Sequence, residues 1–159
     1  MVQVCFHLHH FNGYTIRRAG SIGYRKEKAM ENIEKVRELF AKDRFATENG
    51  MVIDEIGDHS AVCSLELSER HLNAMGNVMG GVHYTLADFA FAVASNWQAP
   101  GVVGINNSIA YLSPIKGKKL IARASLIKDG RSTCVYNVAI TDELGTKVAD
   151  VQCMGFHVK

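Results

Sequence analysis

The segment that most restricts the fold of this chain is Gly80–Asn96, which reads GGVHYTLADFAFAVASN. Drawn as a helix, it carries apolar or small residues on every side. A helix of this kind is stable in water only when other parts of the protein surround it. The rest of the chain is therefore expected to supply a surface that encloses it.

Six strands are expected to form that surface. Two precede the helix, at 51–56 and 59–67, and four follow it, at 102–112, 119–128, 133–141 and 147–158. Within them, apolar and polar residues alternate, and Asp129-Gly130 between two of them is typical of a hairpin turn. Because such strands must bury one face, we expect an α+β fold in which a curved antiparallel sheet wraps around one long central helix.

The beginning of the chain differs from the rest. Residues 1–29 hold five basic residues against a single acid, Glu27, and show no periodicity, whereas an amphipathic helical pattern begins at Met30. We expect one functional domain over 30–159. The basic segment before it is either disordered or a mis-assigned upstream start.

The sequence does not indicate that the protein binds nucleic acid or a metal, or that it spans a membrane. The net charge of the 159 residues is only +2, and no apolar run approaches the ~18 residues of a membrane helix. The three histidines of the basic segment are loosely spaced, and no cage of carboxylates or cysteines accompanies them; they are His7, His9 and His10. The four cysteines have no zinc-like spacing, and we expect reduced thiols in a cytoplasmic protein; they are Cys5, Cys63, Cys134 and Cys153.

Two features of the central segment point to chemistry. Gly80-Gly81 opens the expected helix, where backbone N–H groups have no intrahelical partner and could polarise a carbonyl oxygen. A glycine pair for close backbone packing is the alternative. Asp88 falls in the middle of the same helix, where we expect it to be buried. A buried carboxylate is costly unless it is paired or hydrogen-bonded, so a function explains Asp88 better than stability does. An aspartate that caps a neighbouring strand or loop is the alternative. Asn73, just before the helix, either orients water or forms a turn.

The spacing of these residues has a structural consequence. Gly80 and Asp88 are eight residues apart, which is about 12 Å along one helix. A single reacting carbon is too small to contact both. If both act, Gly80 comes from one subunit and Asp88 from another, and the protein is an obligate dimer with composite sites.

At these residues the chain resembles the PaaI-type hotdog-fold thioesterases, over about residues 30–158. Their signature runs roughly H-x-N-x-x-G-x-x-H-G-G-x-x-x-x-L-x-D-x-A, and a later strand ends in Y-x-x-P, here at Tyr111 to Pro114. The matching residues of the signature are His71, Asn73, Gly76, Gly80, Gly81, Leu86, Asp88 and Ala90. The resemblance implies a hotdog fold, a homodimer or homotetramer, and hydrolysis of acyl-CoA thioesters without a cofactor.

The resemblance also implies residue roles. Asp88 corresponds to the catalytic carboxylate, as nucleophile or general base, Gly80 to the amide that polarises the thioester carbonyl, and Asn73 to the residue that positions water. Gly81 is expected to contact the substrate. Arg131, after the hairpin turn, is either a contact for the CoA phosphates or a solvated turn residue.

Two positions depart from the signature. Met79 stands where similar proteins carry a histidine; His83, four residues on, either compensates at the substrate site or is a half-buried core residue. Gly104 stands where some members carry serine or threonine, so hydrolysis would be slow or need another group to hold the water. Two other functions stay open: a non-catalytic acyl-CoA binding module, and a hotdog enoyl-CoA hydratase or dehydratase using Asp88 and His83.

Overall fold

A computed structural model of the chain describes residues 32–158 and confirms the expected α+β architecture. A helical segment at 32–40 is followed by the short helix α2 (Arg44–Thr47), a 3-10 turn η1 (Glu69–His71) and the long helix α3 (Gly80–Asn96). The strands are β1 (Met51–Gly57), β2 (Ser60–Glu66), β3 (Val102–Tyr111), β4 (Lys119–Asp129), β5 (Thr133–Asp142) and β6 (Lys147–His157). Every strand end lies within one residue of the expected position. Only α2 and η1 are unexpected.

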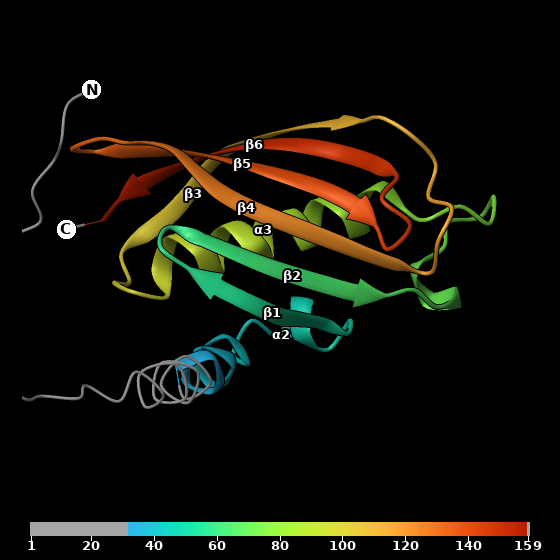
Figure 1. Cartoon of the computed structure of the whole chain (residues 1–159), viewed down its shortest axis with the longest axis horizontal. Coiled ribbons are helices and arrows are strands. Elements are labelled where there is room, and N and C mark those ends of the chain that lie inside the picture. Colours follow the sequence, from blue (N-terminus) through green and yellow to red (C-terminus); the bar gives the residue numbers. More distant parts are fainter. Residues whose placement is uncertain (1–31, 159) are drawn as a thin grey trace, which may run out of the picture.

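The six strands form one antiparallel sheet in the order β1-β2-β4-β5-β6-β3. The sheet curves around α3, which runs along its inner face (Figure 1). Inward side chains of the central strands and of α3 make the core; the largest fully buried ones include Leu65, Leu86, Leu120, Val138 and Ile140. Strands β1 and β3 are the two edges of the sheet, and β3 follows α3 directly.

The sheet covers α3 on one side only, which corrects one expectation. Leu86, Phe89 and Ala90 are buried, but Tyr84 and Asp88 are exposed in the single chain. The expectation that Asp88 is buried is therefore wrong for one subunit on its own. The physical reason is the width of the sheet: six strands wrap part of the helix and leave a strip of it facing outward beside β3.

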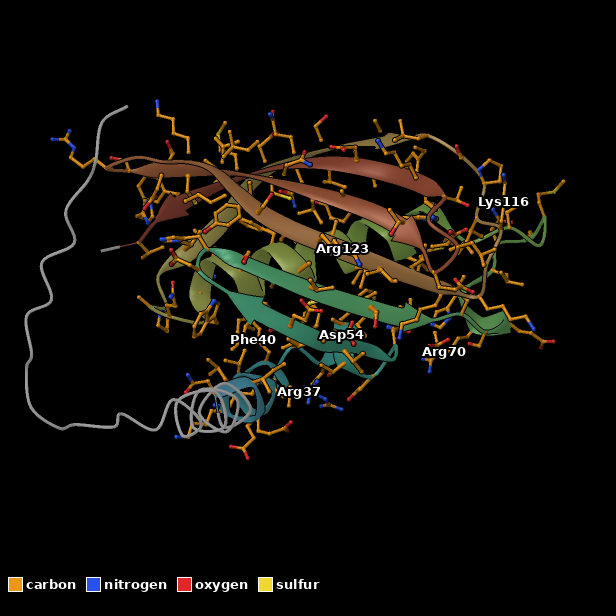
Figure 2. All side chains as sticks on the ribbon, in the orientation of Figure 1. Arg37, Phe40, Asp54, Arg70, Lys116 and Arg123 are labelled. Carbon is orange, nitrogen blue, oxygen red and sulfur yellow. The ribbon has the colours of Figure 1, made fainter. Side chains whose placement is uncertain are left out.

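The segment before β1 packs against the opposite edge of the sheet. Arg37 and Phe40 of the 32–40 helix lie next to β1 (Figure 2). The guanidinium of Arg37 donates two hydrogen bonds to the carbonyl oxygen of Ile53, at 2.9 and 2.6 Å. Phe40 meets Phe89 of α3 edge to face, with ring centroids 6.2 Å apart. This segment thus belongs to the folded unit, while the expectation for residues 1–29 lies outside the described residues.

The structure also bears on the expectations for cysteines, metal ions and membrane helices. Cys63, Cys134 and Cys153 are free and buried, as expected, and Cys5 lies outside the described residues. Within residues 32–158 no cluster of three histidines, cysteines or carboxylates could hold a metal ion, and the three histidines of the basic segment lie outside that range. Among the described helices, none combines the length and apolar character needed to cross a membrane.

A buried carboxylate fixes the loop that leads from β3 to β4. Asp142 accepts hydrogen bonds from the backbone N–H groups of Lys116, Gly117, Leu144 and Thr146, at 2.7 to 3.2 Å. Burial alone would raise the pKa of Asp142, but the amides of Thr146, Lys116 and Gly117 outweigh it and lower the pKa from 3.8 to about 2. The carboxylate thus ties together two loops that meet at one end of the sheet.

We predict that Asp142→Asn lowers the melting temperature at pH 7 by several degrees, because the amide loses the charge and two of its acceptor positions. The folded pKa of about 2 is below the unfolded value, so the stabilisation is present above about pH 4 and is lost as pH falls toward 2. Thermal unfolding measured from pH 7 to pH 2 should show that the difference in melting temperature between the variant and the wild type disappears as the pH falls from about 4 toward 2. Asp150→Asn, at an exposed carboxylate of β6, is the control and should leave the melting temperature unchanged.

Candidate active site

The approach to α3 is a tight loop whose geometry depends on Asn73. Its side-chain oxygen accepts hydrogen bonds from the backbone N–H groups of Met75 and Asn77, at 2.9 and 3.1 Å. The backbone N–H of Asn73 donates to the carbonyl oxygen of Asn77 at 2.7 Å. Asn73 therefore forms a turn, and its side chain is exposed.

His71 holds this loop to the rest of the domain. The buried ring of His71 accepts a hydrogen bond from the Ser68 backbone N–H at 3.0 Å and donates through Nε2 to the Asn49 carbonyl at 3.0 Å. Its own carbonyl oxygen accepts from the Met79 backbone N–H at 2.9 Å. His71 thus positions the first residues of α3 and has no ring nitrogen left for a substrate.

The start of α3 presents two free backbone amides. Within residues 32–158 the N–H groups of Gly80 and Gly81 meet no acceptor, as expected at a helix N-terminus. The Tyr111 hydroxyl donates to the carbonyl oxygen of Gly80 at 3.0 Å. A Cβ at position 80 would lie 2.8 Å from that hydroxyl, so close packing requires glycine there. Both explanations of the glycine pair thus hold at Gly80.

His83 lies one turn further along α3 and is buried rather than half-buried. Its Nδ1 donates to the Met79 carbonyl at 3.2 Å, and its ring meets Tyr111 edge to face. Burial lowers the pKa of His83, and the hydrogen bond to Met79 offsets this only in part. The ring is therefore neutral near pH 7, and the exposed Met79 side chain carries no charge or donor to replace a histidine.

A cleft of about 850 Å³ opens beside the start of α3. His83 and Tyr111 line it together with the loops 72–78 and 112–118. Its walls combine apolar side chains, such as Leu72 and Ile115, with Lys118. A ligand with an apolar part and an anionic part fits this lining.

Asp88 lies in a different place, on the open strip of α3. It borders a smaller pocket of about 320 Å³, shared with Asp43, Phe45, Thr85 and other residues. Burial, and then the nearby Asp88 carboxylate, raise the pKa of Asp43. The two carboxylates therefore face one region, and this pocket has no lining residue in common with the cleft beside Gly80.

Strand β3 supplies the direct contacts of Asp88. The Asn107 side-chain amide donates to Asp88 Oδ1 at 2.9 Å and to the Tyr84 hydroxyl at 3.2 Å. A Cβ at Gly104 would lie 3.9 Å from the same Oδ1. The thiol of Cys153 is also near, but burial and then Asp88 raise its pKa to about 12, so it stays protonated.

The structure separates the expected site residues into two groups. Gly80, Gly81, Met79 and His83 gather at the start of α3, and Asp88 lies two turns away with Asn107 and Tyr84. Arg131 lies elsewhere, exposed in the turn between β4 and β5. One subunit therefore carries the amides and the carboxylate as two half-sites about 12 Å apart.

Sequence reasoning misses Asn107, Tyr84 and Tyr111 as neighbours of the site. Tyr84 does follow a readable rule, since it lies four residues before Asp88 on one helix face. Asn107 gives only a weak signal, because it is one of three consecutive polar residues in its strand, with Asn106 and Ser108. The Y-x-x-P motif includes Tyr111 but does not predict its contact with Gly80.

Comparison with known proteins identifies relatives of this chain and of its fold. A family model of the thioesterase superfamily matches residues 75–149. The acyl-coenzyme A thioesterase PaaI of Escherichia coli K12 is 30% identical over 112 residues, which cover 70% of this chain and 80% of the relative.

Two solved structures are similar as well. A mutant of the phenylacetic acid degradation protein PaaI from Thermus thermophilus has a TM-score of 0.68 and 31% identity, covering 72% of this chain and 99% of that one. A hypothetical thioesterase from Streptococcus pneumoniae, solved with coenzyme A, has a TM-score of 0.68 and 26% identity, covering 75% and 96%.

The packing at the start of α3 predicts different costs for the two glycines. Gly80→Ala should destabilise the protein by about 1–3 kcal/mol, because its Cβ meets the Tyr111 ring and hydroxyl. Gly81→Ala meets only the flexible end of Met79 and should be neutral or stabilising by up to about 1 kcal/mol. Urea or thermal unfolding of both variants checks this, and equal stability of the pair would refute it.

Proposed function

Because the chain belongs to the thioesterase superfamily, and to its PaaI-like members, we propose that it hydrolyses acyl-CoA thioesters to a free acid and CoA. The observation that carries this proposal is the pairing of free helix-start amides at Gly80 and Gly81 with a carboxylate, Asp88, held two turns along the same helix. Thioester hydrolysis needs these two functions and no cofactor.

The amide of Gly80 polarises the thioester carbonyl. Negative charge develops on that oxygen when the carbonyl carbon is attacked, and a backbone N–H at a helix N-terminus stabilises it through a hydrogen bond and the helix dipole. The Tyr111 hydroxyl, bound to the Gly80 carbonyl, holds this peptide in place. Met79 at the helix start contributes apolar contact with the substrate, and Gly81 and His83 line the same end of α3.

Asp88 either activates the attacking water or attacks the thioester carbon itself. As a general base it takes a proton from water while the water oxygen bonds to the carbonyl carbon; the C–S bond then breaks, and the CoA thiolate leaves and takes up the proton. As a nucleophile the carboxylate bonds to the acyl carbon while the C–S bond breaks and the CoA thiolate leaves; water then hydrolyses the resulting anhydride, which frees the acid and the carboxylate, and the released proton goes to the thiolate. Asn73, through its exposed side-chain amide, positions the water in either route.

The two half-sites meet only if two subunits combine. Strand β3 is an open edge beside the exposed strip of α3 that holds Asp88. Pairing two chains there brings Asp88 of one subunit toward the Gly80 amides of the other and covers the exposed carboxylate. We therefore infer a homodimer with two composite sites, which can pair again to a tetramer.

The CoA part of the substrate carries phosphates, and basic side chains lie near the cleft beside Gly80. Lys118 lines the cleft, and Lys116 lies in the same loop between β3 and β4 (Figure 2). Arg131, in the β4–β5 turn, is the further candidate for a phosphate contact. The similar structure from Streptococcus pneumoniae was solved with coenzyme A, which supports CoA as the carrier.

The alternative functions are less well supported by the geometry. A hydratase would need His83 as the acid–base partner of Asp88, but the His83 ring is already bound to Met79 and packed on Tyr111 at the start of α3. If the protein only bound acyl-CoA, the exposed, hydrogen-bonded carboxylate of Asp88 would have no role.

The role of Asp88 predicts a specific loss. Purified protein should release free thiol from some member of an acyl-CoA panel graded by chain length and including aryl-CoAs. Asp88→Asn should reduce kcat at least ~100-fold while leaving the melting temperature close to that of the wild type, because the side chain is exposed within one subunit. An Asp88→Ala protein with full turnover would remove the assignment. Binding without turnover by the wild type would favour the binding module.

The composite site predicts complementation between two inactive variants. Gly80→Pro removes the amide donor, and combining it with Tyr111→Phe removes the hydroxyl that a Cβ would strike. Mixed with Asp88→Ala subunits, it should form heterodimers with one intact site and about half the wild-type activity. Differently tagged chains, co-expressed and purified through both tags, provide the sample. Inactive heterodimers, with Tyr111→Phe alone still active, would show that Gly80 and Asp88 do not share a site.

A further inference from the structure

The contact between Asn107 and Asp88 has features that packing alone does not explain. The Nδ2 group of Asn107 uses one hydrogen for Asp88 Oδ1 and the other for the Tyr84 hydroxyl. This fixes the orientation of the amide, since the opposite orientation would turn its oxygen toward the carboxylate. The amide oxygen of Asn107 is then buried without a hydrogen-bond partner among residues 32–158.

A buried carbonyl oxygen without a partner destabilises the folded chain. An apolar side chain of similar size at position 107 would avoid that cost while still packing against α3. Asparagine is therefore not the residue that would make the fold most stable at this position. It does, however, donate a hydrogen bond to one particular oxygen of Asp88.

A bulge in β3 directs Asn107 toward Asp88. Positions 104 and 107 would face opposite sides of a regular strand, because side chains alternate. The register of β3 on β6 shifts between Gly104 and Asn106, however, so that Gly104 pairs with Gly155 and Asn107 pairs with Cys153. Both partners are buried, so the bulge turns 104 and 107 to the same inner side.

Gly104 leaves room for this arrangement. It brings its backbone near Asp88 but has no side chain to donate a hydrogen bond, and its Cβ position is 3.9 Å from Asp88 Oδ1. Asn107 reaches the same oxygen from three residues further along the strand. Within the described part of the chain, no hydrogen bond is made to the other oxygen, Oδ2, which is left for water or the thioester carbon.

From this geometry we infer that Asn107 is the positioning residue of the catalytic carboxylate. It holds Asp88 through Oδ1 so that Oδ2 faces the reacting carbon, and it replaces the donor that Gly104 does not supply. This inference rests on the proposed thioesterase function. It adds a residue that acts through Asp88 rather than on the substrate.

The test is Asn107→Leu, which removes the donor and the unpartnered oxygen together. We expect kcat to fall by about 10- to 100-fold, as for a misplaced catalytic group, with KM within about twofold of the wild type. We expect the melting temperature to stay the same or rise. The matched control is Asn106→Leu, at the neighbouring exposed position, which should leave kcat unchanged.

A second-site variant separates positioning from packing. Adding Gly104→Ser to Asn107→Leu places a hydroxyl within reach of Asp88 Oδ1 and should restore kcat by about tenfold. Adding Asp88→Asn to Asn107→Leu should cause no loss beyond that of Asp88→Asn alone, since the two residues act as a unit.

Two outcomes would overturn the inference. One is full kcat in Asn107→Leu. The other is a melting temperature below that of the wild type, which would make Asn107 a structural residue. The melting temperature tests the structural role of Asn107 and does not require the protein to be active. The proposed function is tested separately, because a wild type that releases no thiol would refute it. A drop in kcat at unchanged melting temperature, followed by rescue, supports the inference.

Discussion

The fold depends on how far one curved sheet encloses one apolar helix. Burying α3 is the largest hydrophobic contribution that the sequence offers, and the six strands do this by bending around it. The same contact limits the fold, because the sheet ends at β3 before the helix is fully covered. The strip left open carries the carboxylate of Asp88, so the arrangement that stabilises the subunit also determines where this carboxylate faces.

Much of this arrangement could be predicted from the sequence. Period-two alternation and turn residues such as Asp129-Gly130 place the strands, because both signals act over a few neighbouring residues. The helices α2 and η1 escape prediction because four and three residues are too short to show a helical period. The exposure of Asp88 escapes it because residue type alone does not say how much of a helix a sheet covers.

The site is predictable in its chemical groups and less so in its contacts. Gly80 and Asp88 are recognisable by their positions on one helix, and their separation follows from helical rise. Asn107 is not, because its approach to Asp88 depends on a register shift between β3 and β6 that no local pattern records. Tyr111 is a similar case, since its hydroxyl reaches Gly80 across thirty-one residues of sequence.

The position of Arg37 has a consequence for how this sheet meets other copies of itself. An antiparallel sheet with two open edges can add chains at both, and the product of such growth is a fibre. Here the guanidinium of Arg37 occupies the carbonyl oxygen of Ile53 on β1, beneath the 32–40 helix. With that carbonyl oxygen occupied, the β1 edge has one acceptor fewer to offer to an added strand. A single arginine thus disfavours the addition of further chains at β1.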